Sequence, residues 1–136
     1  HRGMRRLFYC YINSTWRCEM QVRRGDIFIA RLPEGIGSEQ GGIRPVVVIQ
    51  NDIGNRYSPL VIVAAVTGQR KQKMPTHVVL NEEGLAKSSL LLLESIYTID
   101  KARLIKRIGT LSERTLAKMD KAAAISIGIS PKYFTK

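Results

Sequence analysis

The stretch GSEQGGIRPVVVIQ, residues 37–50, joins a glycine-rich loop to a run of β-branched residues. A short continuous apolar run bounded by turn residues predicts a buried strand, here over residues 46–49. A loop is predicted over the ten residues 33–42, which contain four glycines and one proline. Glycines let the backbone approach a ligand closely. The segment therefore predicts a buried strand entered from a candidate ligand-binding loop.

Further short strands are predicted on both sides of this run. Apolar and β-branched segments are separated by stretches of turn residues, which is typical of a small, strongly bent sheet. The polar stretches 51–59 and 68–75 are predicted to be loops, and the second is strongly basic. The strands are expected over residues 22–31, 60–67, 76–80, 89–93 with continuation to 99, and 104–108.

The pattern of apolar residues changes to a helical period near the C-terminus. Thr110 and Glu113 fit a capping box, and Ser112 is an alternative cap. Gly128 and Pro131 mark the end of the predicted helix. The apolar positions are Leu116, Met119, Ala123 and Ile127. Strands followed by one helix predict an α+β fold, a small bent β-barrel with a C-terminal α-helix.

The composition of the 136-residue chain fits one soluble, folded domain. Apolar residues make up 44%, and no apolar run is long enough to cross a membrane. The net charge of +11, from 22 Lys/Arg against 11 Asp/Glu, favours a polyanionic partner. Cys10 and Cys18 are the only cysteines and His77 the only histidine after the first residue, which argues against a disulfide scaffold and a Cys/His zinc site. A cytoplasmic protein is expected.

Residues 1–19 differ from the rest of the chain. They contain both cysteines and the only tryptophan, and they show no period of a helix or strand. We expect a non-native or disordered N-terminal extension, with Met20 as the natural start and one domain over residues 20–136. The extension carries four arginines and one glutamate, so +8 of the +11 net charge belongs to the domain.

Arg44 stands where the glycine-rich loop meets the buried strand, and Pro45 stiffens that entry. An arginine anchored in this way can grip two oxygens of a phosphate with its planar guanidinium. Ser38, Glu39 and Gln40 add a hydroxyl, a carboxylate and an amide. The alternative is a glycine-rich hairpin with a solvated arginine, and composition alone favours this alternative, because charged residues usually lie at the surface.

The loop and strand, GSEQGGIRP followed by VVVIQND, resemble the signature of the MazF/PemK family of toxins, in its Gram-positive MazF-like branch. The resemblance covers residues 22–129. Its other matching segments, in order, are RRGDIFIA (23–30), NDIGNRYSP (51–59), VAAVT (63–67), PTHV (75–78) and TIDKARL (98–104).

This resemblance implies a homodimer of Src-homology-3-like, PemK/CcdB-like barrels that cleaves single-stranded mRNA at a specific sequence without a metal or other cofactor. The 2′-hydroxyl of the substrate attacks the adjacent phosphorus and leaves a 2′,3′-cyclic phosphate and a 5′-hydroxyl. By position, the catalytic residues fall on Arg44 and Thr67. A fixed guanidinium stabilises charge that builds on the phosphoryl oxygens, and a threonine hydroxyl can bind those oxygens or position the 2′-hydroxyl.

The proton acceptor stays open between two interpretations of Glu39. It is either the general base, if the loop folds over the site, or a group that binds substrate or structures the loop. Arginine stays protonated in ordinary settings, so Arg44 is an unsuitable base. The resemblance assigns His77 no catalytic role, and a structural histidine is expected.

The RNA-binding residues are expected mainly in the loops, where polar side chains can bond splayed base edges and cations can hold phosphates. Tyr57 is either a stacking platform or a core aromatic. Relatives in this branch usually carry glutamine at position 95, so Ser95 puts the cleaved sequence in doubt; the branch implies a U-rich pentamer such as UACAU. The expected RNA-binding set is Ser38, Gln40, Gly41, Gly42, Asn51, Arg56, Gln69, Thr76 and Ser95, with Arg70, Lys71 and Lys73 as phosphate contacts.

The resemblance also implies an acidic, MazE-like antitoxin as a protein partner in a type II toxin–antitoxin system, and the basic domain suits such a partner. Two other functions stay open. One is a CcdB-like toxin that inhibits gyrase, and the other is a non-catalytic barrel that binds RNA. The pair Arg44 and Thr67 with the GSEQGG loop favours the nuclease.

Overall fold

A computed structural model describes residues 7–12, 15–37, 41–68, 74–82, 84–85, 89–130 and 132, with the backbone alone for 7–12 and 15–20. The elements are β1 (Leu7–Ile12), β2 (Thr15–Met20), β3 (Asp26–Leu32), β4 (Gly42–Val48), α1 (Asp52–Tyr57), β5 (Leu60–Thr67), β6 (His77–Leu80), β7 (Ser89–Asp100), a 3-10 turn (Lys101–Arg103), β8 (Leu104–Thr110) and α2 (Glu113–Ile127).

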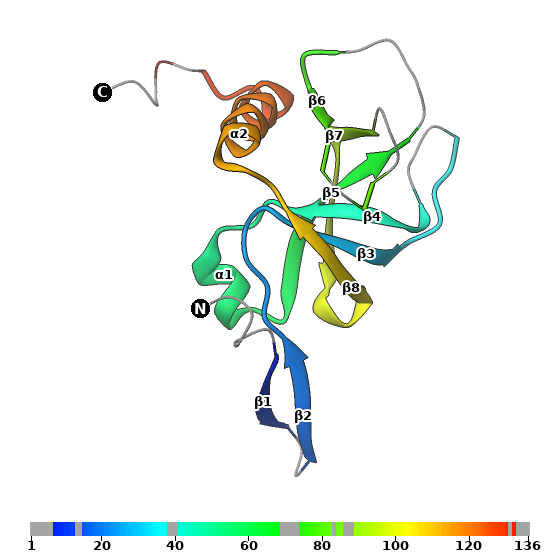
Figure 1. Ribbon diagram of the computed structural model, residues 1–136, viewed down its shortest axis with the longest axis vertical. Helices are drawn as coiled ribbons and strands as arrows, with labels where there is room; N and C mark the ends of the chain where they lie inside the picture. The colour runs from blue at the N-terminus through cyan, green and yellow to red at the C-terminus, as the bar shows by residue number, and fades with distance from the viewer. Residues whose placement is uncertain are drawn as a thin grey trace.

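The domain is built on one antiparallel sheet of six strands in the order β6-β7-β5-β4-β3-β8. Figure 1 shows the sheet curling strongly and α2 lying beside its β6–β7 side. The expected α+β class, a small bent barrel-like sheet with a C-terminal helix, is confirmed. The strand expected over residues 60–67 has those bounds in the structure.

Two apolar clusters form on the two faces of the sheet, because successive strand residues point to opposite sides. One cluster lies inside the curl and includes Phe28, Val46 and Ala65. The other includes Val47 and Leu91 and is covered by α2 through residues such as Met119 and Ala122. The two faces matter for function, since Arg44 on β4 shares the alternation of Val46 and so belongs to the inner face.

A bulge in β7 bends the sheet. Ala64 on β5 pairs with Ile96, whereas the next residue, Ala65, pairs with Leu92, so residues 93–95 of β7 have no partner on β5. The backbone N–H of Leu93 donates instead to the carbonyl of Thr76 at 3.0 Å. Bulges of this kind redirect side chains and are common beside functional sites.

The predicted loop over residues 51–59 is wrong, because it contains the short helix α1. Asn51 caps the helix by accepting a hydrogen bond from the N–H of Gly54 at 2.8 Å. Asn55 is buried and donates to the carbonyl of Gln50 at 2.8 Å, while the Gln50 amide donates back at 3.1 Å. A helix of six residues has little stability of its own. The buried amide pair stabilises it, and the sequence pattern could not show this contact.

The ends of two other elements also differ from expectation. Thr110 is the last residue of β8, so the capping box with Glu113 is wrong, and the alternative cap Ser112 accepts from the N–H of Thr115 at 3.2 Å. The expected end at Gly128 is confirmed by its left-handed conformation, with φ of 79°.

The N-terminal extension contains the antiparallel hairpin β1–β2, which its sequence pattern did not indicate. Its assignment as non-native or disordered, and the boundary at Met20, stay predictions.

Candidate active site

Arg44 is held near the start of β4 by two backbone carbonyls. Its Nε donates to the oxygen of Gly41 at 3.0 Å, and its Nη1 donates to the oxygen of Val66 at 3.4 Å. The side chain is half-buried. Because the two acceptors lie on different segments, they fix the direction of the guanidinium toward the end of β5.

Thr67 is the last residue of β5 and directly follows Val66, the second acceptor for Arg44. Val46 on β4 pairs with Ala65 on β5, and Arg44 and Thr67 each lie two residues beyond this pair, so alternation places both side chains on its face of the sheet. Side chains that face each other across two strands lie on the same face of a sheet. The fold therefore brings the two predicted catalytic residues together.

The glycines before Arg44 shape this site through the backbone. Gly42 has a φ of 79°, which favours glycine. A side chain at Gly41 would collide with the backbone of Pro33 and Gly35. Gly41 is therefore required for the tight loop whose carbonyl holds Arg44. Of the predicted site, Ser38, Glu39, Gln40 and Gln69, and the phosphate contacts Arg70, Lys71 and Lys73, lie outside the described residues.

Asn51 and Arg56 lie at the opposite end of β4 from Gly42, on and before α1 (Figure 1). The Asn51 oxygen is used in the helix cap. The Arg56 guanidinium lies over the ring of Tyr57 at 5.5 Å, and this ring is 74% exposed rather than part of the core. Within one chain, the structure does not bring these residues to Arg44 and Thr67, and their contact with RNA stays a prediction.

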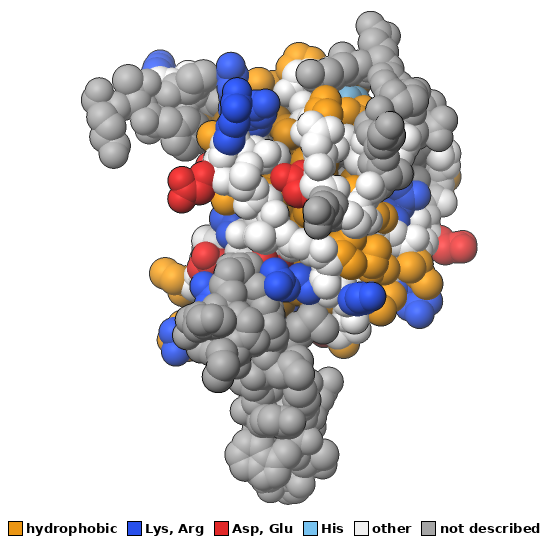
Figure 2. Space-filling model, in the orientation of Figure 1, with side chains coloured by type: hydrophobic (Ala, Val, Ile, Leu, Met, Phe, Trp, Pro, Cys, Tyr) orange, Lys and Arg blue, Asp and Glu red, His pale blue; other side chains and the backbone are white. Residues whose placement is uncertain are grey.

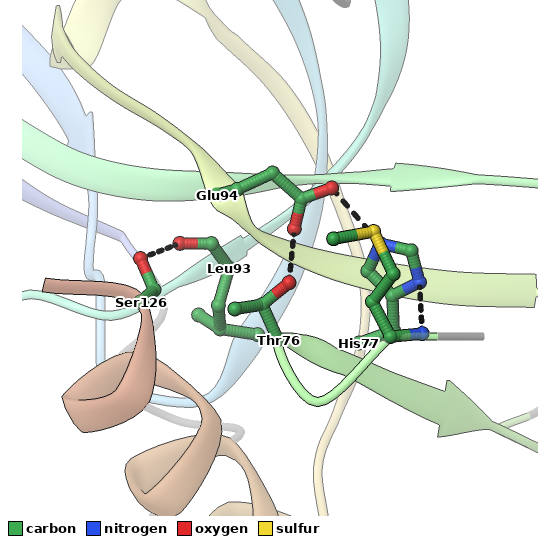
Figure 3. Close-up of polar contacts among 6 residues, drawn as sticks. Thr76, His77, Leu93, Glu94 and Ser126 are labelled. Carbon is green, nitrogen blue, oxygen red and sulfur yellow. Dashed lines mark hydrogen bonds and ion pairs between the residues drawn. The ribbon is translucent and has the colours of Figure 1, made fainter. Parts of the chain in front are cut away.

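Glu94, Thr76 and His77 form a polar cluster at the β7 bulge (Figure 3). The Thr76 hydroxyl donates to Oε1 of Glu94 at 2.7 Å, and Nε2 of His77 lies 2.9 Å from Oε2. The other ring nitrogen, Nδ1, accepts from the backbone N–H of Met74 at 3.2 Å. Since Nδ1 is an acceptor, the proton is on Nε2, which donates to the carboxylate.

The carboxyl group of Glu94 has a pKa below its ordinary value. Burial alone would raise this pKa, but the hydrogen bonds from His77 and Thr76 stabilise the charged form and outweigh it. The Glu94 side chain remains 41% exposed, whereas that of His77 is 5% exposed. His77 therefore lies beneath a carboxylate that faces solvent, and the expectation of a structural histidine stays a prediction.

A sequence model described as the PemK-like, MazF-like toxin of type II toxin–antitoxin systems matches residues 23–127. The chain belongs to this family. A relative, endoribonuclease EndoA of Bacillus subtilis (strain 168), is 51% identical over 113 residues, covering 81% of this chain and 97% of that protein.

Solved structures of a MazF protein and of another endoribonuclease share the fold. MazF (Form-I) from Deinococcus radiodurans has a TM-score of 0.70 at 22% identity, over 81% of this chain and 99% of its own. An endoribonuclease in complex with its cognate antitoxin from Mycobacterial species has a TM-score of 0.68 at 22% identity, over 80% and 97% respectively.

Within the described part of the chain, no three His, Cys, Asp or Glu side chains gather as a metal site would require. The same residues include no helix long and apolar enough to span a membrane. Hydrophobic side chains gather on the surface over β3, β4 and β8, with Lys and Arg beside them (Figure 2). Ile43 and Ile105 in this region are 58% and 47% exposed.

Glu94 has no role predicted from the sequence, because its partners are 17 and 18 residues away and only the pairing of β6 with β7 brings them close. The neighbouring Ser95 is half-buried inside the bulge. An acidic residue directly after four leucines was the available signal, since a charged residue that ends a buried run must leave the core.

Proposed function

We propose that this MazF-like endoribonuclease toxin cleaves single-stranded RNA at a short preferred sequence, without a metal ion. The observation that carries the proposal is the Arg44 guanidinium, held by the carbonyls of Gly41 and Val66 beside Thr67. A cation fixed by the backbone before substrate arrives needs no reorganisation during the reaction, which is how charge stabilisation accelerates a reaction.

The proposed step is an in-line displacement at phosphorus. The 2′-oxygen forms a bond to phosphorus, and the bond from phosphorus to the 5′-oxygen breaks. The 2′-hydroxyl loses its proton to a base, and the departing 5′-oxygen gains one. The products are a 2′,3′-cyclic phosphate and a 5′-hydroxyl. Arg44 offsets the negative charge on the phosphoryl oxygens, and the Thr67 hydroxyl binds one of them or orients the 2′-hydroxyl.

The proton acceptor is proposed to be Glu39, in the loop before Arg44. In the alternative interpretation, Glu39 binds substrate or structures the loop. A Glu39→Gln variant distinguishes this alternative from a general base. A general base lost in this way lowers the rate by about 10²–10⁴-fold, whereas a loop-structuring group changes substrate binding more than the rate.

Two partners are proposed besides RNA. One is a second copy of the chain, and the other is an acidic, MazE-like antitoxin. The domain's share of the net charge, +8, suits an acidic protein. The exposed apolar surface over β3, β4 and β8 supplies area for a protein contact. Such a toxin acts on mRNA in the cytoplasm.

The test is cleavage of a long, sequence-diverse single-stranded RNA in excess EDTA, with the new ends mapped by primer extension. We expect discrete cuts with cyclic-phosphate ends for the wild type. Arg44→Ala is expected to give none, while Arg114→Ala, which removes the same charge from an exposed position on α2, cuts normally. No cuts by the wild type, or normal cuts by Arg44→Ala, would contradict the proposal and favour a gyrase inhibitor or a binding module.

A further inference from the structure

The polar cluster at the β7 bulge offers hydrogen-bond acceptors to solvent. The Thr76 hydroxyl proton is committed to Glu94, so the Thr76 oxygen is left as an acceptor. The Glu94 carboxylate can accept about four hydrogen bonds. Among the described residues, it accepts from Thr76, His77 and its own backbone N–H. With its side chain 41% exposed, Glu94 keeps capacity for a donor from a ligand.

The cluster is held rigidly from both sides of the bulge. On the β6 side, Thr76 and His77 fix the two carboxylate oxygens, and Met74 fixes the His77 ring. On the α2 side, the Ser126 hydroxyl donates to the carbonyl of Leu93 at 2.6 Å (Figure 3). A carboxylate restrained by this many bonds is pre-organised, which is what recognition of a ligand group requires.

The cluster lies on the same face of the sheet as Thr67. Thr67 on β5 pairs with Leu90 on β7, and Leu90 pairs with Val79 on β6. His77 is two residues before Val79, so its side chain points to that same face. From strand spacing and rise, position 77 is roughly 12 Å from position 67. A short stretch of single-stranded RNA passing over Thr67 can span this separation.

We propose that Glu94 and Thr76 form a base-reading subsite that accepts hydrogen bonds from the exocyclic amino group of an RNA base beside the cleavage site. This inference rests on the proposed cleavage of RNA by Arg44 and Thr67. Adenine, cytosine and guanine carry such an amino group, whereas uracil presents one N–H flanked by two carbonyl oxygens. An acceptor-only cluster repels those oxygens, so the subsite excludes uracil at one position of the recognised sequence.

His77 and Ser126 are positioning residues in this proposal, because they contact the bulge and not the base. His77 supplies the donor that holds Oε2 of Glu94, and Ser126 holds the carbonyl of Leu93. Together they set the direction of the carboxylate and the place of Ser95, the neighbouring residue in the bulge.

The experiment compares cleavage of a randomised RNA pool by the wild type, Glu94→Gln and Glu113→Gln. Glutamine keeps the size of the side chain but adds an amide donor that can bond a uracil oxygen. We expect Glu94→Gln to raise the use of uracil at one position by about tenfold relative to amino-bearing bases, with the other positions unchanged. Glu113→Gln removes the same charge from an exposed position on α2 and should keep the wild-type profile.

A second measurement identifies the amino group itself. Oligonucleotides with a 2′-deoxy residue at the cut position bind without being cleaved by the proposed chemistry. Replacing the preferred base by its analogue without the amino group should weaken binding about tenfold for the wild type and far less for Glu94→Gln. If Glu94→Gln does not fold, Thr76→Val, which removes only the hydroxyl, is tested instead and should also weaken exclusion of uracil at that position.

The outcomes separate this inference from the proposed function. An unchanged base profile for Glu94→Gln, from a wild type that cuts RNA, would overturn the subsite and leave the nuclease in place. Equal binding of both analogues by the wild type would also overturn the subsite. A wild type that makes no cuts in any RNA would overturn the function on which the subsite rests.

Discussion

Arg44 and Glu94 are both fixed, charged side chains on the curled sheet, but they are fixed in different ways. Arg44 is held by carbonyls of the main chain, from Gly41 and Val66. Glu94 is held by side chains, those of Thr76 and His77, in a bulge. Main-chain anchors do not change when side chains are substituted, whereas side-chain anchors do. The comparison suggests a constant chemical centre beside a reading site that substitutions can retune.

The largest effect is expected at the chemical centre. Arg44→Lys keeps the positive charge but loses the planar fork that reaches two carbonyls and a phosphate together. We expect the rate of RNA cleavage to fall by about 10²–10³-fold. Single-turnover cleavage of one preferred oligonucleotide measures it. The base preference of Arg44→Lys, determined from its residual cuts, should match that of the wild type. A changed preference would contradict the separation of the chemical centre at Arg44 from the reading site at Glu94.

A smaller loss of rate is expected for Thr67→Val, which removes the hydroxyl and keeps the shape of the side chain. A hydrogen bond to a charged phosphoryl oxygen is worth about 1.5–3 kcal/mol, or roughly 10–150-fold in rate. The same single-turnover assay applies. A wild-type rate of cleavage for Thr67→Val would show that Thr67 has no catalytic role and that Arg44 is the only one of the two residues that acts in catalysis.

His77 tests the reading site without touching RNA. His77→Phe removes the donor to Glu94, while His77→Gln can supply one from its amide. We expect His77→Phe to weaken exclusion of uracil by about fivefold, corresponding to roughly 1 kcal/mol for one hydrogen bond, and His77→Gln to restore part of it. Thermal unfolding of both variants is the control, because a merely structural histidine would alter stability and leave base preference unchanged.

The pH dependence of base selection follows from the lowered pKa of Glu94. Its folded pKa lies below the ordinary 4.5, so the carboxylate stays charged in mildly acidic solution. Both its acceptor function and its contribution to stability are present above the unfolded pKa and are lost as pH falls through the folded pKa. The ratio of uracil to amino-base cleavage should therefore be equal at pH 7.5 and about pH 5.5. The same comparison in His77→Gln, which has no titratable ring at position 77, isolates the carboxylate, and a ratio that changes there would contradict an ionised Glu94 as the reader.

Among the substitutions, the smallest effect is expected from Ser126→Ala, which removes the hydroxyl that donates to the carbonyl of Leu93. One neutral hydrogen bond contributes about 0.5–1.5 kcal/mol to stability, so thermal unfolding should shift by a few degrees. Base selection should weaken less than in His77→Phe. A larger change in base selection than in His77→Phe would show that Ser126 on α2, and not His77 on β6, mainly positions the β7 bulge.

The sequence predicted the sheet better than the site. Alternating apolar runs located the strands, and the strand over residues 60–67 was located to the residue. Helix α1 was missed because its stability comes from the buried contacts of Asn55 with Gln50, which local propensity does not contain. The β7 bulge was missed for the same reason, since it depends on pairing with β5 and β6.

For the site, Arg44 and Thr67 were expected from the resemblance to the family, and composition alone left Arg44 open to a solvated-hairpin interpretation. The hydrogen bond from Arg44 to the carbonyl of Val66, the residue before Thr67, supplied the physical link between them. Glu94 could not be predicted, because its hydrogen bonds depend on two strand registers and one bulge.

The most direct test of the separation between chemistry and reading is a crossed kinetic measurement. Two oligonucleotides that differ only by uracil or the preferred amino-bearing base at the read position are cleaved by the wild type, Arg44→Lys and Glu94→Gln. We predict that Arg44→Lys slows both substrates by the same factor, and that Glu94→Gln mainly changes the ratio between them. An unequal slowing by Arg44→Lys, or an unchanged ratio in Glu94→Gln, would contradict this separation.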